Sequence, residues 1–262
     1  MKSTSTISKD SITSLAIGGF DGIHLAHREL IRKAQGLMIV SKYNSNLTPK
    51  EYRCKFVNKP CFFYELEKIK KFDCDEFAKF LKNEFPSLKK VVVGYDFRYG
   101  YKRACGIDDL KSYFEVEVVD EILLEGVSVH SGVIRELISN GEIEKADKLL
   151  GRAYSIEGNV IKGQGIGKNE LVPTINVSIC DFLLPQNGVY ATKSKVNNQV
   201  YNSVTFIGIR QSTDSCFSIE THIIDNEIKN VSKNIEIFFY KKIRDNKKFI
   251  ITIFYPIFDI TL

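Results

Sequence analysis

Two histidines that follow a pair of glycines form the first pattern in the chain that could do chemistry. His24 and His27 are three residues apart and come shortly after Gly18 and Gly19. Residues three apart lie on the same side of a helix, so both imidazoles would project from one helical turn. The first N–H groups of a helix lack partners within it and favour anions. The pattern therefore predicts a phosphate site, with two polar surface histidines beside an ordinary glycine turn as the alternative.

The residues around the histidines predict the elements that position them. Residues 15–17 are apolar, as in a buried strand, and the glycines allow a tight turn that a ligand can approach closely. A zinc site is less favoured, because the histidines lack the spacing and the third ligand of a zinc-binding helix. Residues 37–40 also suit the start of a second strand. A helix over residues 24–38 is indicated by apolar side chains at helical spacing, namely Leu30, Ile31, Ala34, Leu37 and Met38.

Asp96 and Arg98 follow another buried strand. Three valines at residues 91–93 end at Gly94, and the two charged residues come directly afterwards. In open α/β sheets, ligands bind at the carboxyl ends of the strands. Both side chains are therefore candidates for shaping the same site, and an ordinary ion pair at a strand end is the alternative.

The remainder of the first half continues to alternate strands and helices. Asp73 can cap a helix through residues 75–81, and residues 116–119 suit a short strand. A helix is expected to open within residues 128–135. Residues 134–150 read as two helical pieces that end at a glycine cap, Gly151. We expect a domain boundary here, which gives domains 1–150 and 151–262.

The second half predicts a small antiparallel barrel, because short alternating segments follow one another without helices. The segments are residues 154–161, 174–179, 188–196, 200–208, 217–225 and 234–240. On the fifth segment, Glu220 and His222 share one face. By itself, Glu220 would most simply be a solvated carboxylate on a strand. The glycine-rich stretch over residues 163–168 fails both the Walker A and the dinucleotide-binding patterns, so alone it predicts only a flexible loop.

Composition limits the classes of function. The chain has 262 residues, a formal net charge of +5 and 44% hydrophobic residues, as in an ordinary globular protein. Its lysines are scattered, so the charge does not require nucleic acid and suits phosphorylated small molecules equally well. No apolar run approaches the length of a membrane span, which favours the cytoplasm. Six cysteines without a Cys-x-x-Cys pair are expected to be reduced packing residues.

Three segments of the first half together resemble a known signature. Residues 19–24 with His27, residues 91–100 and residues 128–135 are similar to motifs of the nucleotidylyltransferase superfamily, in the form found in prokaryotic bifunctional riboflavin kinase/FAD synthetases. The resemblance implies a Rossmann-like parallel sheet. It implies catalytic roles for His24 and His27, and a site shaped by Asp96 and Arg98. It further implies phosphate binding by Gly19, Phe20, Asp21, Ser131 and Arg135.

The second half resembles the riboflavin kinase barrel of the same family. Residues 163–176 resemble its nucleotide loop, which implies that Thr174 and Asn176 bind Mg²⁺, an ion that takes oxygen ligands. Residues 218–225 resemble its catalytic strand, with Glu220 as the general base. The same resemblance implies ATP binding by Gly163, Gly165, Gly167 and Lys168, and flavin binding or site shaping by Arg210 and His222.

The sequence departs from the family pattern in both halves. Ala26 and Tyr99 are mild changes, but His130 and Gly132 replace two hydroxyl residues, and the Phe-x-Pro-His-Pro-like strand end expected before residue 60 is missing. In the barrel, Leu171 replaces a glycine. Residues 250–262 do not read as the amphipathic helix that closes family members.

The resemblance implies that the chain converts riboflavin to FMN and FMN to FAD, with ATP as co-substrate and Mg²⁺. Two alternatives stay open: an enzyme with only one active half, and a regulator that binds flavin or nucleotide without turnover. The expected partners are riboflavin, FMN, FAD and ATP, without nucleic acid or membrane. The sequence predicts no oligomeric state.

Overall fold

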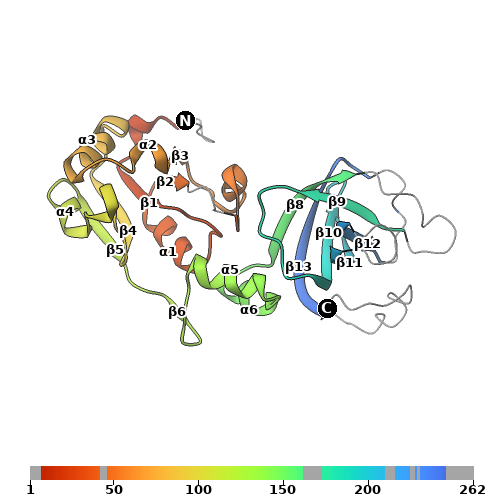
Figure 1. Ribbon diagram of the computed structural model, residues 1–262. Coiled ribbons are helices and arrows are strands. Elements are labelled where there is room, and N and C mark those ends of the chain that lie inside the picture. The colour runs from red at the N-terminus through yellow and green to blue at the C-terminus, as the bar shows by residue number, and fades with distance from the viewer. Residues whose placement is uncertain are drawn as a thin grey trace. The chain divides into compact units, whose positions relative to one another are not determined.

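The computed structural model describes residues 7–41, 46–161, 173–209, 216–224, 228 and 231–245 (Figure 1). The chain divides into two compact units, Met1–Val133 and Ile134–Leu262. This division falls upstream of the boundary expected after residue 150. The reason is that helix α6 (Ile143–Leu150) packs on strands β8 (Tyr154–Ile161) and β13 (Asn234–Asp245).

The first unit is built on a parallel five-stranded sheet, as the sequence predicts. The strand order is β3-β2-β1-β4-β5, and β1 lies between β2 and β4 with Leu15 opposite Gly36 on one side and Val91 on the other. Strands buried on both faces read as continuous apolar runs, and the three valines of β4 are fully buried. The strands are β1 (Ser14–Gly18), β2 (Gly36–Ser41), β3 (Cys61–Glu65), β4 (Lys90–Gly94) and β5 (Glu115–Val119).

Short helices connect these strands. Asp73 caps α3 through a capping box with Glu76, as its position predicts. The helices are α1 (Leu25–Lys33), α2 (Leu66–Ile69), α3 (Cys74–Glu84) and α4 (Ile107–Lys111), with 3-10 turns η1 (Lys9–Ser11), η2 (Lys50–Phe56) and η3 (Tyr101–Arg103). A hairpin of β6 (Leu123–Leu124) and β7 (Val127–Ser128) precedes α5 (Ser131–Ser139).

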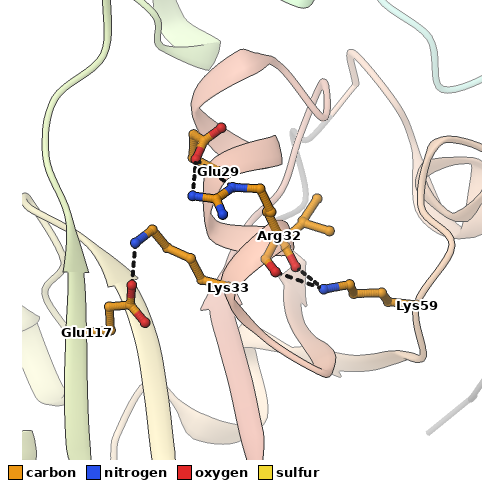
Figure 2. Close-up of polar contacts among 6 residues, drawn as sticks. Glu29, Arg32, Lys33, Lys59 and Glu117 are labelled. Carbon is orange, nitrogen blue, oxygen red and sulfur yellow. Dashed lines mark hydrogen bonds and ion pairs between the residues drawn. The ribbon is translucent and has the colours of Figure 1, made fainter.

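Helix α1 is shorter than the periodicity predicts. It ends at Lys33, and Leu37 and Met38 belong to strand β2. A short apolar run fits a buried strand and a helix equally well, so periodicity alone cannot separate the two. The end of α1 is held by Lys59, whose ammonium donates to the carbonyls of Ile31 at 2.6 Å and Arg32 at 3.2 Å (Figure 2). The same ammonium donates to the carbonyl of Ala34.

Two of the six cysteines are paired, which corrects the expectation that all are reduced. Cys74 at the start of α3 forms a disulfide with Cys105 across 31 residues of sequence. No short-range spacing signals this bond, because the fold brings the two residues together. Cys105 also forms a two-residue bridge with Tyr99, so the disulfide ties α3 to the loop that follows β4.

The second unit contains the predicted antiparallel barrel. Its six strands close in the order β10-β11-β12-β9-β8-β13, and β10 pairs with β13. The predicted β segments match the observed strands closely, and Gly151 ends α6 in the left-handed conformation at φ +68°. The strands are β8 (Tyr154–Ile161), β9 (Ile175–Ile179), β10 (Gly188–Val196), β11 (Gln199–Ile209), β12 (Phe217–Ile223) and β13 (Asn234–Asp245).

Buried hydroxyl groups cross the barrel interior between β10, β11 and β12. Thr205 Oγ1 lies 2.9 Å from Thr192 Oγ1 and 2.8 Å from Thr221 Oγ1. Buried polar groups are costly unless they are hydrogen-bonded, so these contacts stabilise one register of the three strands. Thr221 directly follows Glu220 on β12. In the part of the chain that the structure describes, no helix has the length and apolar character needed to span a membrane.

Candidate active sites

The turn between β1 and α1 has an unusual backbone. Phe20 and Ile23 have positive φ values of 50° and 44°, and Gly22 has a φ of 94°. A positive φ is uncommon outside glycine and strained for a β-branched residue such as Ile23. The side chains of Phe20 and Ile23 are both buried in the core of the unit, which holds the turn in place. The surrounding structure therefore holds this turn in a conformation that the chain would not adopt alone.

The two predicted histidines lie together at the start of α1. Their rings stack with centroids 3.6 Å apart and an angle of 18° between their planes. His24 is the N-cap residue, and its Nδ1 accepts a hydrogen bond from the backbone N–H of His27 at 3.3 Å. His24 is buried, with 3% of its surface exposed. One of the free N–H groups expected for the phosphate is thus already used by His24 itself.

Ser131 joins this pair from the start of α5. His24 Nε2 lies 3.2 Å from Ser131 Oγ, and the serine hydroxyl donates to the carbonyl of Asp21 at 2.7 Å. A hydroxyl has one proton, so Ser131 accepts from His24 Nε2–H while it donates to Asp21. Since Nδ1 also accepts, the contacts assign the neutral Nε2–H form to His24. The structure therefore brings the first and third predicted segments into one hydrogen-bonded chain.

The carboxylate of Asp21 is directed into the protein. Its Oδ1 accepts from the backbone N–H of Thr48 at 3.0 Å and lies 3.8 Å from Nη2 of Arg53. The hydroxyl of Thr48 accepts from the N–H of Gly22 at 2.7 Å. Sequence reasoning missed Thr48 and Arg53, because they come from an irregular segment without a recognisable pattern.

Asp96 and Arg98 lie beyond the carboxyl end of β4, next to β1, where the strand order reverses direction. Their side chains have different neighbours. Asp96 Oδ2 is 4.0 Å from Nε2 of His130, whereas the guanidinium of Arg98 packs against Gly106, where an added Cβ would lie 2.0 Å from Nη1. His130 Nδ1 accepts from the N–H of Gly132 at 3.1 Å.

His130 thus caps the start of α5, a task that a hydroxyl residue performs equally well. Arg135 lies on the same helix, four residues after Ser131, and is half-buried. Residues four apart on a helix share a face, so Arg135 and Ser131 project from the same side of α5.

The barrel brings two predicted residues directly opposite each other. Asn176 on β9 is the antiparallel partner of Glu220 on β12, and Phe206 on β11 flanks Glu220 on the other side. Side chains at opposite positions have Cβ atoms about 5 Å apart. Glu220 Oε1 is shielded from solvent. Thr174 precedes Asn176 by two residues and is half-buried.

His222 contacts the segment that leads into Thr174. Its Nδ1 donates to the carbonyl oxygen of Pro173 at 2.9 Å. This contact joins β12, which carries Glu220, to the residue before Thr174. His222 is therefore hydrogen-bonded to the peptide group that joins Pro173 to Thr174, a contact that the sequence did not predict.

Several expected residues lie outside the described part of the chain. These are Gly163, Gly165, Gly167, Lys168 and Arg210, together with residues 250–262. Among the described residues, no group of three or more His, Cys, Asp or Glu side chains could hold a metal ion. Thr174 and Asn176 each carry a side-chain oxygen, the kind of ligand that a hard cation such as Mg²⁺ accepts.

Comparison with known proteins agrees with both units. Residues 150–252 match the riboflavin kinase family model. A bifunctional riboflavin kinase/FMN adenylyltransferase from Listeria monocytogenes is 31% identical over 90% of this chain and 85% of its own length. The enzymes of the same name from Buchnera aphidicola, subspecies Acyrthosiphon pisum, and from Bacillus subtilis are 31% and 29% identical, over 92% and 90% of this chain and 88% and 85% of their own lengths.

A solved structure from Streptococcus pneumoniae, described as a macrolide-efflux protein, covers 92% of this chain and 91% of its own. Its TM-score is 0.79 at 23% identity, which supports the fold alone. The parallel α/β unit and the kinase-type barrel define a transferase with two units. The chain belongs to the bifunctional riboflavin kinase/FMN adenylyltransferase family.

Proposed function

We propose that the chain phosphorylates riboflavin to FMN in its barrel and adenylylates FMN to FAD in its α/β unit, with ATP as the donor in both reactions. The observation that carries the proposal is the pairing of Glu220 with Asn176 across β12 and β9. The pairing supports the proposal because Glu220 and Asn176 are directly opposite each other, and phosphoryl transfer depends mainly on groups held in position. ATP as donor also supports the expected cytoplasmic location.

In the barrel, Glu220 accepts the proton of the ribityl 5′-hydroxyl of riboflavin. The freed oxygen forms a bond to the γ-phosphorus of ATP, and ADP leaves with the electron pair of the broken P–O bond. Thr174 and Asn176 would hold Mg²⁺, which when bound neutralises the charge of the phosphates. His222 stabilises the approach to Thr174 through Pro173. Binding of ATP by residues 163–168 and of the flavin by Arg210 remains part of the proposal.

In the α/β unit, a phosphate oxygen of FMN attacks the α-phosphorus of ATP, and pyrophosphate leaves. No proton has to be removed from the attacking phosphate, so the residues mainly bind and orient charge. His24, His27, Ser131 and Arg135 are assigned to the phosphates, and Gly19 and Phe20 to the turn that approaches them. Asp96 and Arg98 shape the site beyond β4.

Two observations favour two active units over a single one. His130 and Gly132 replace hydroxyl residues, but His130 still caps α5, and Ser131 still joins His24 to the carbonyl of Asp21. In the barrel, a general base beside oxygen ligands has no use in a regulator that only binds. These contacts support turnover in both units.

A chromatographic time course with riboflavin, ATP and Mg²⁺, followed by a second run that starts from FMN, tests the proposal. We expect FMN and then FAD in the first run, and FAD in the second. FMN without FAD would leave only a kinase, and FAD from FMN without FMN from riboflavin would leave only an adenylyltransferase. Flavin binding without any product would indicate a regulator.

A further inference from the structure

The strained turn before His24 is held by a segment that lies outside all recognised motifs. Thr48 and Arg53 both have 1% of their surface exposed, and both contact this turn from η2 or the residues just before it. A fully buried arginine is unusual, because burial removes the water that stabilises its charge. Such a residue needs a specific counter-charge, and Asp21 Oδ1 lies 3.8 Å from its Nη2.

Thr48 contacts two consecutive residues of the turn. Its backbone N–H donates to Asp21 Oδ1 at 3.0 Å, and its hydroxyl accepts from the backbone N–H of Gly22 at 2.7 Å. The first contact orients the side chain of Asp21, and the second fixes the peptide between Asp21 and Gly22. Positive φ values at the non-glycine residues Phe20 and Ile23 persist only where the surroundings impose them. Thr48 supplies the hydrogen bonds that do so from this side.

Asp21 links this segment to the histidines. Its carboxylate contacts Thr48 and Arg53, while its carbonyl accepts from Ser131, which in turn accepts from His24 Nε2–H. A change in the orientation of Asp21 therefore moves its carbonyl oxygen, which accepts from the Ser131 hydroxyl. The direction of this hydroxyl in turn determines whether Ser131 can accept the proton of His24 Nε2. The guanidinium of Arg53 also offsets the negative charge of Asp21, which would otherwise repel a phosphate at the same turn.

We propose that Thr48 and Arg53 are positioning residues of the adenylyl-transfer site. They hold the turn at residues 20–23 in its strained conformation, and they set the hydrogen-bonded chain that orients His24. This inference rests on the proposed function of the α/β unit. It assigns a role to the segment before residue 60, in which the expected family pattern is missing.

The test compares Thr48→Val with Thr48→Ser in the full chain. Valine has nearly the shape of threonine but cannot accept from Gly22, whereas serine keeps the hydroxyl. We expect Thr48→Val to lower kcat/KM for FMN adenylylation by about 100-fold, because a small displacement of a reacting group has an effect of this size. Thr48→Ser is expected to stay within about threefold of the wild type.

Thr13→Val is the matched control, because Thr13 lies in the same unit and its hydroxyl contacts only the Gln35 side chain among the contacts described. It should leave adenylylation unchanged. Riboflavin phosphorylation, measured on the same samples, should be equal in all four proteins, which excludes a general loss of folded protein. Equal losses in Thr48→Val and Thr48→Ser, or a fully active Thr48→Val, would overturn the proposal.

A spectroscopic measurement separates this proposal from the proposed function. In ¹⁵N-labelled full chain at mildly alkaline pH, the His24 ring should show the Nε2–H form, assigned by its loss in His24→Gln. In Thr48→Val, we expect the ¹⁵N signals of the His24 ring to shift or to show a mixture of the Nε2–H and Nδ1–H forms. In Thr48→Ser, the signals of the Nε2–H form should be restored. If the wild type makes no FAD, adenylylation fails but the positioning role stands on this signal. An unchanged His24 signal in Thr48→Val overturns the positioning role whatever the activity.

Discussion

Glu220 and Asn176 are directly opposite residues on two antiparallel barrel strands. The carboxylate of Glu220 is half-buried, and its Oε1 is shielded from solvent. The closed barrel gives this pair a rigid frame, since β12 is bonded to β11 on one side and to β9 on the other. If Glu220 is the base and Asn176 a metal ligand, as we propose, the two strands fix the separation of these residues without help from a loop.

Replacing Glu220 with glutamine should remove riboflavin phosphorylation selectively. The amide has nearly the shape of the carboxylate but cannot accept the hydroxyl proton, so we expect kcat for FMN formation to fall by about 10²-fold to 10⁴-fold. Glu157→Gln on β8 makes the same chemical change away from the pair and serves as the control. A Glu220→Gln chain that forms FMN at the normal rate would rule out Glu220 as the base.

His222 should act through the carbonyl of Pro173. The carbonyl oxygen can only accept, so Nδ1 of His222 is the donor of this contact. His222→Phe removes the donor, and we expect about a tenfold loss in kinase activity or in its apparent affinity for Mg²⁺. His222→Asn places an N–H near the position of Nδ1 and should recover most of the loss. Equal activity in all three proteins would contradict this role.

Asp147 should make the stability of the folded chain depend on pH. Burial raises the pKa of its carboxyl to about 7, although the N–H of Tyr154 donates to Oδ1 at 2.7 Å. Between the unfolded value near 4 and about 7, the folded state binds more protons, so the free energy of unfolding falls as pH rises and then levels off. The effect is on the order of a few kcal/mol.

Asp147→Asn keeps the acceptor for Tyr154 but does not titrate. The free energy of unfolding of both proteins can be measured with denaturant from pH 4 to pH 8. As pH rises, we expect this free energy to increase for Asp147→Asn relative to the wild type. Parallel curves for the two proteins would show that Asp147 has an ordinary pKa.

The disulfide between Cys74 and Cys105 predicts the number of reactive thiols. The chain has six cysteines, and four of them are free. Unfolded in denaturant without reductant, the protein should titrate with four thiols, and with six after reduction. Six thiols before reduction would contradict the bond. The reduced form should also allow more hydrogen exchange in the loop after β4, which the bond ties to α3.

The sequence predicted the strands of the barrel more completely than the strands and helices of the first half. Six barrel segments were recognisable because a period of two, interrupted by turn residues, has few other interpretations. Leu37 and Met38 fitted both the predicted helix and the start of a second strand, because a short apolar run suits both periods, and the structure places them in β2. Strand β3 was not predicted.

At the candidate sites, residues in local sequence patterns could be predicted, whereas residues brought there by the tertiary fold could not. His24, Ser131, Asn176 and Glu220 belong to local patterns, and the structure brings the first two together and pairs the last two. Thr48 reaches Gly22 across 26 residues from an irregular segment. No local spacing carries information on such a contact, since only the tertiary fold brings these residues together.

In the proposed function, one chain holds two separate active sites that act in sequence. Mixing two inactivated chains tests it most directly: Glu220→Gln, which should still convert FMN to FAD, and His24→Ala/His27→Ala, which should stop at FMN. Neither alone should convert riboflavin to FAD with ATP and Mg²⁺, and the mixture should restore this conversion because FMN passes between chains through solution. A mixture that forms no FAD, or a Glu220→Gln chain that forms FAD from riboflavin by itself, would contradict the account.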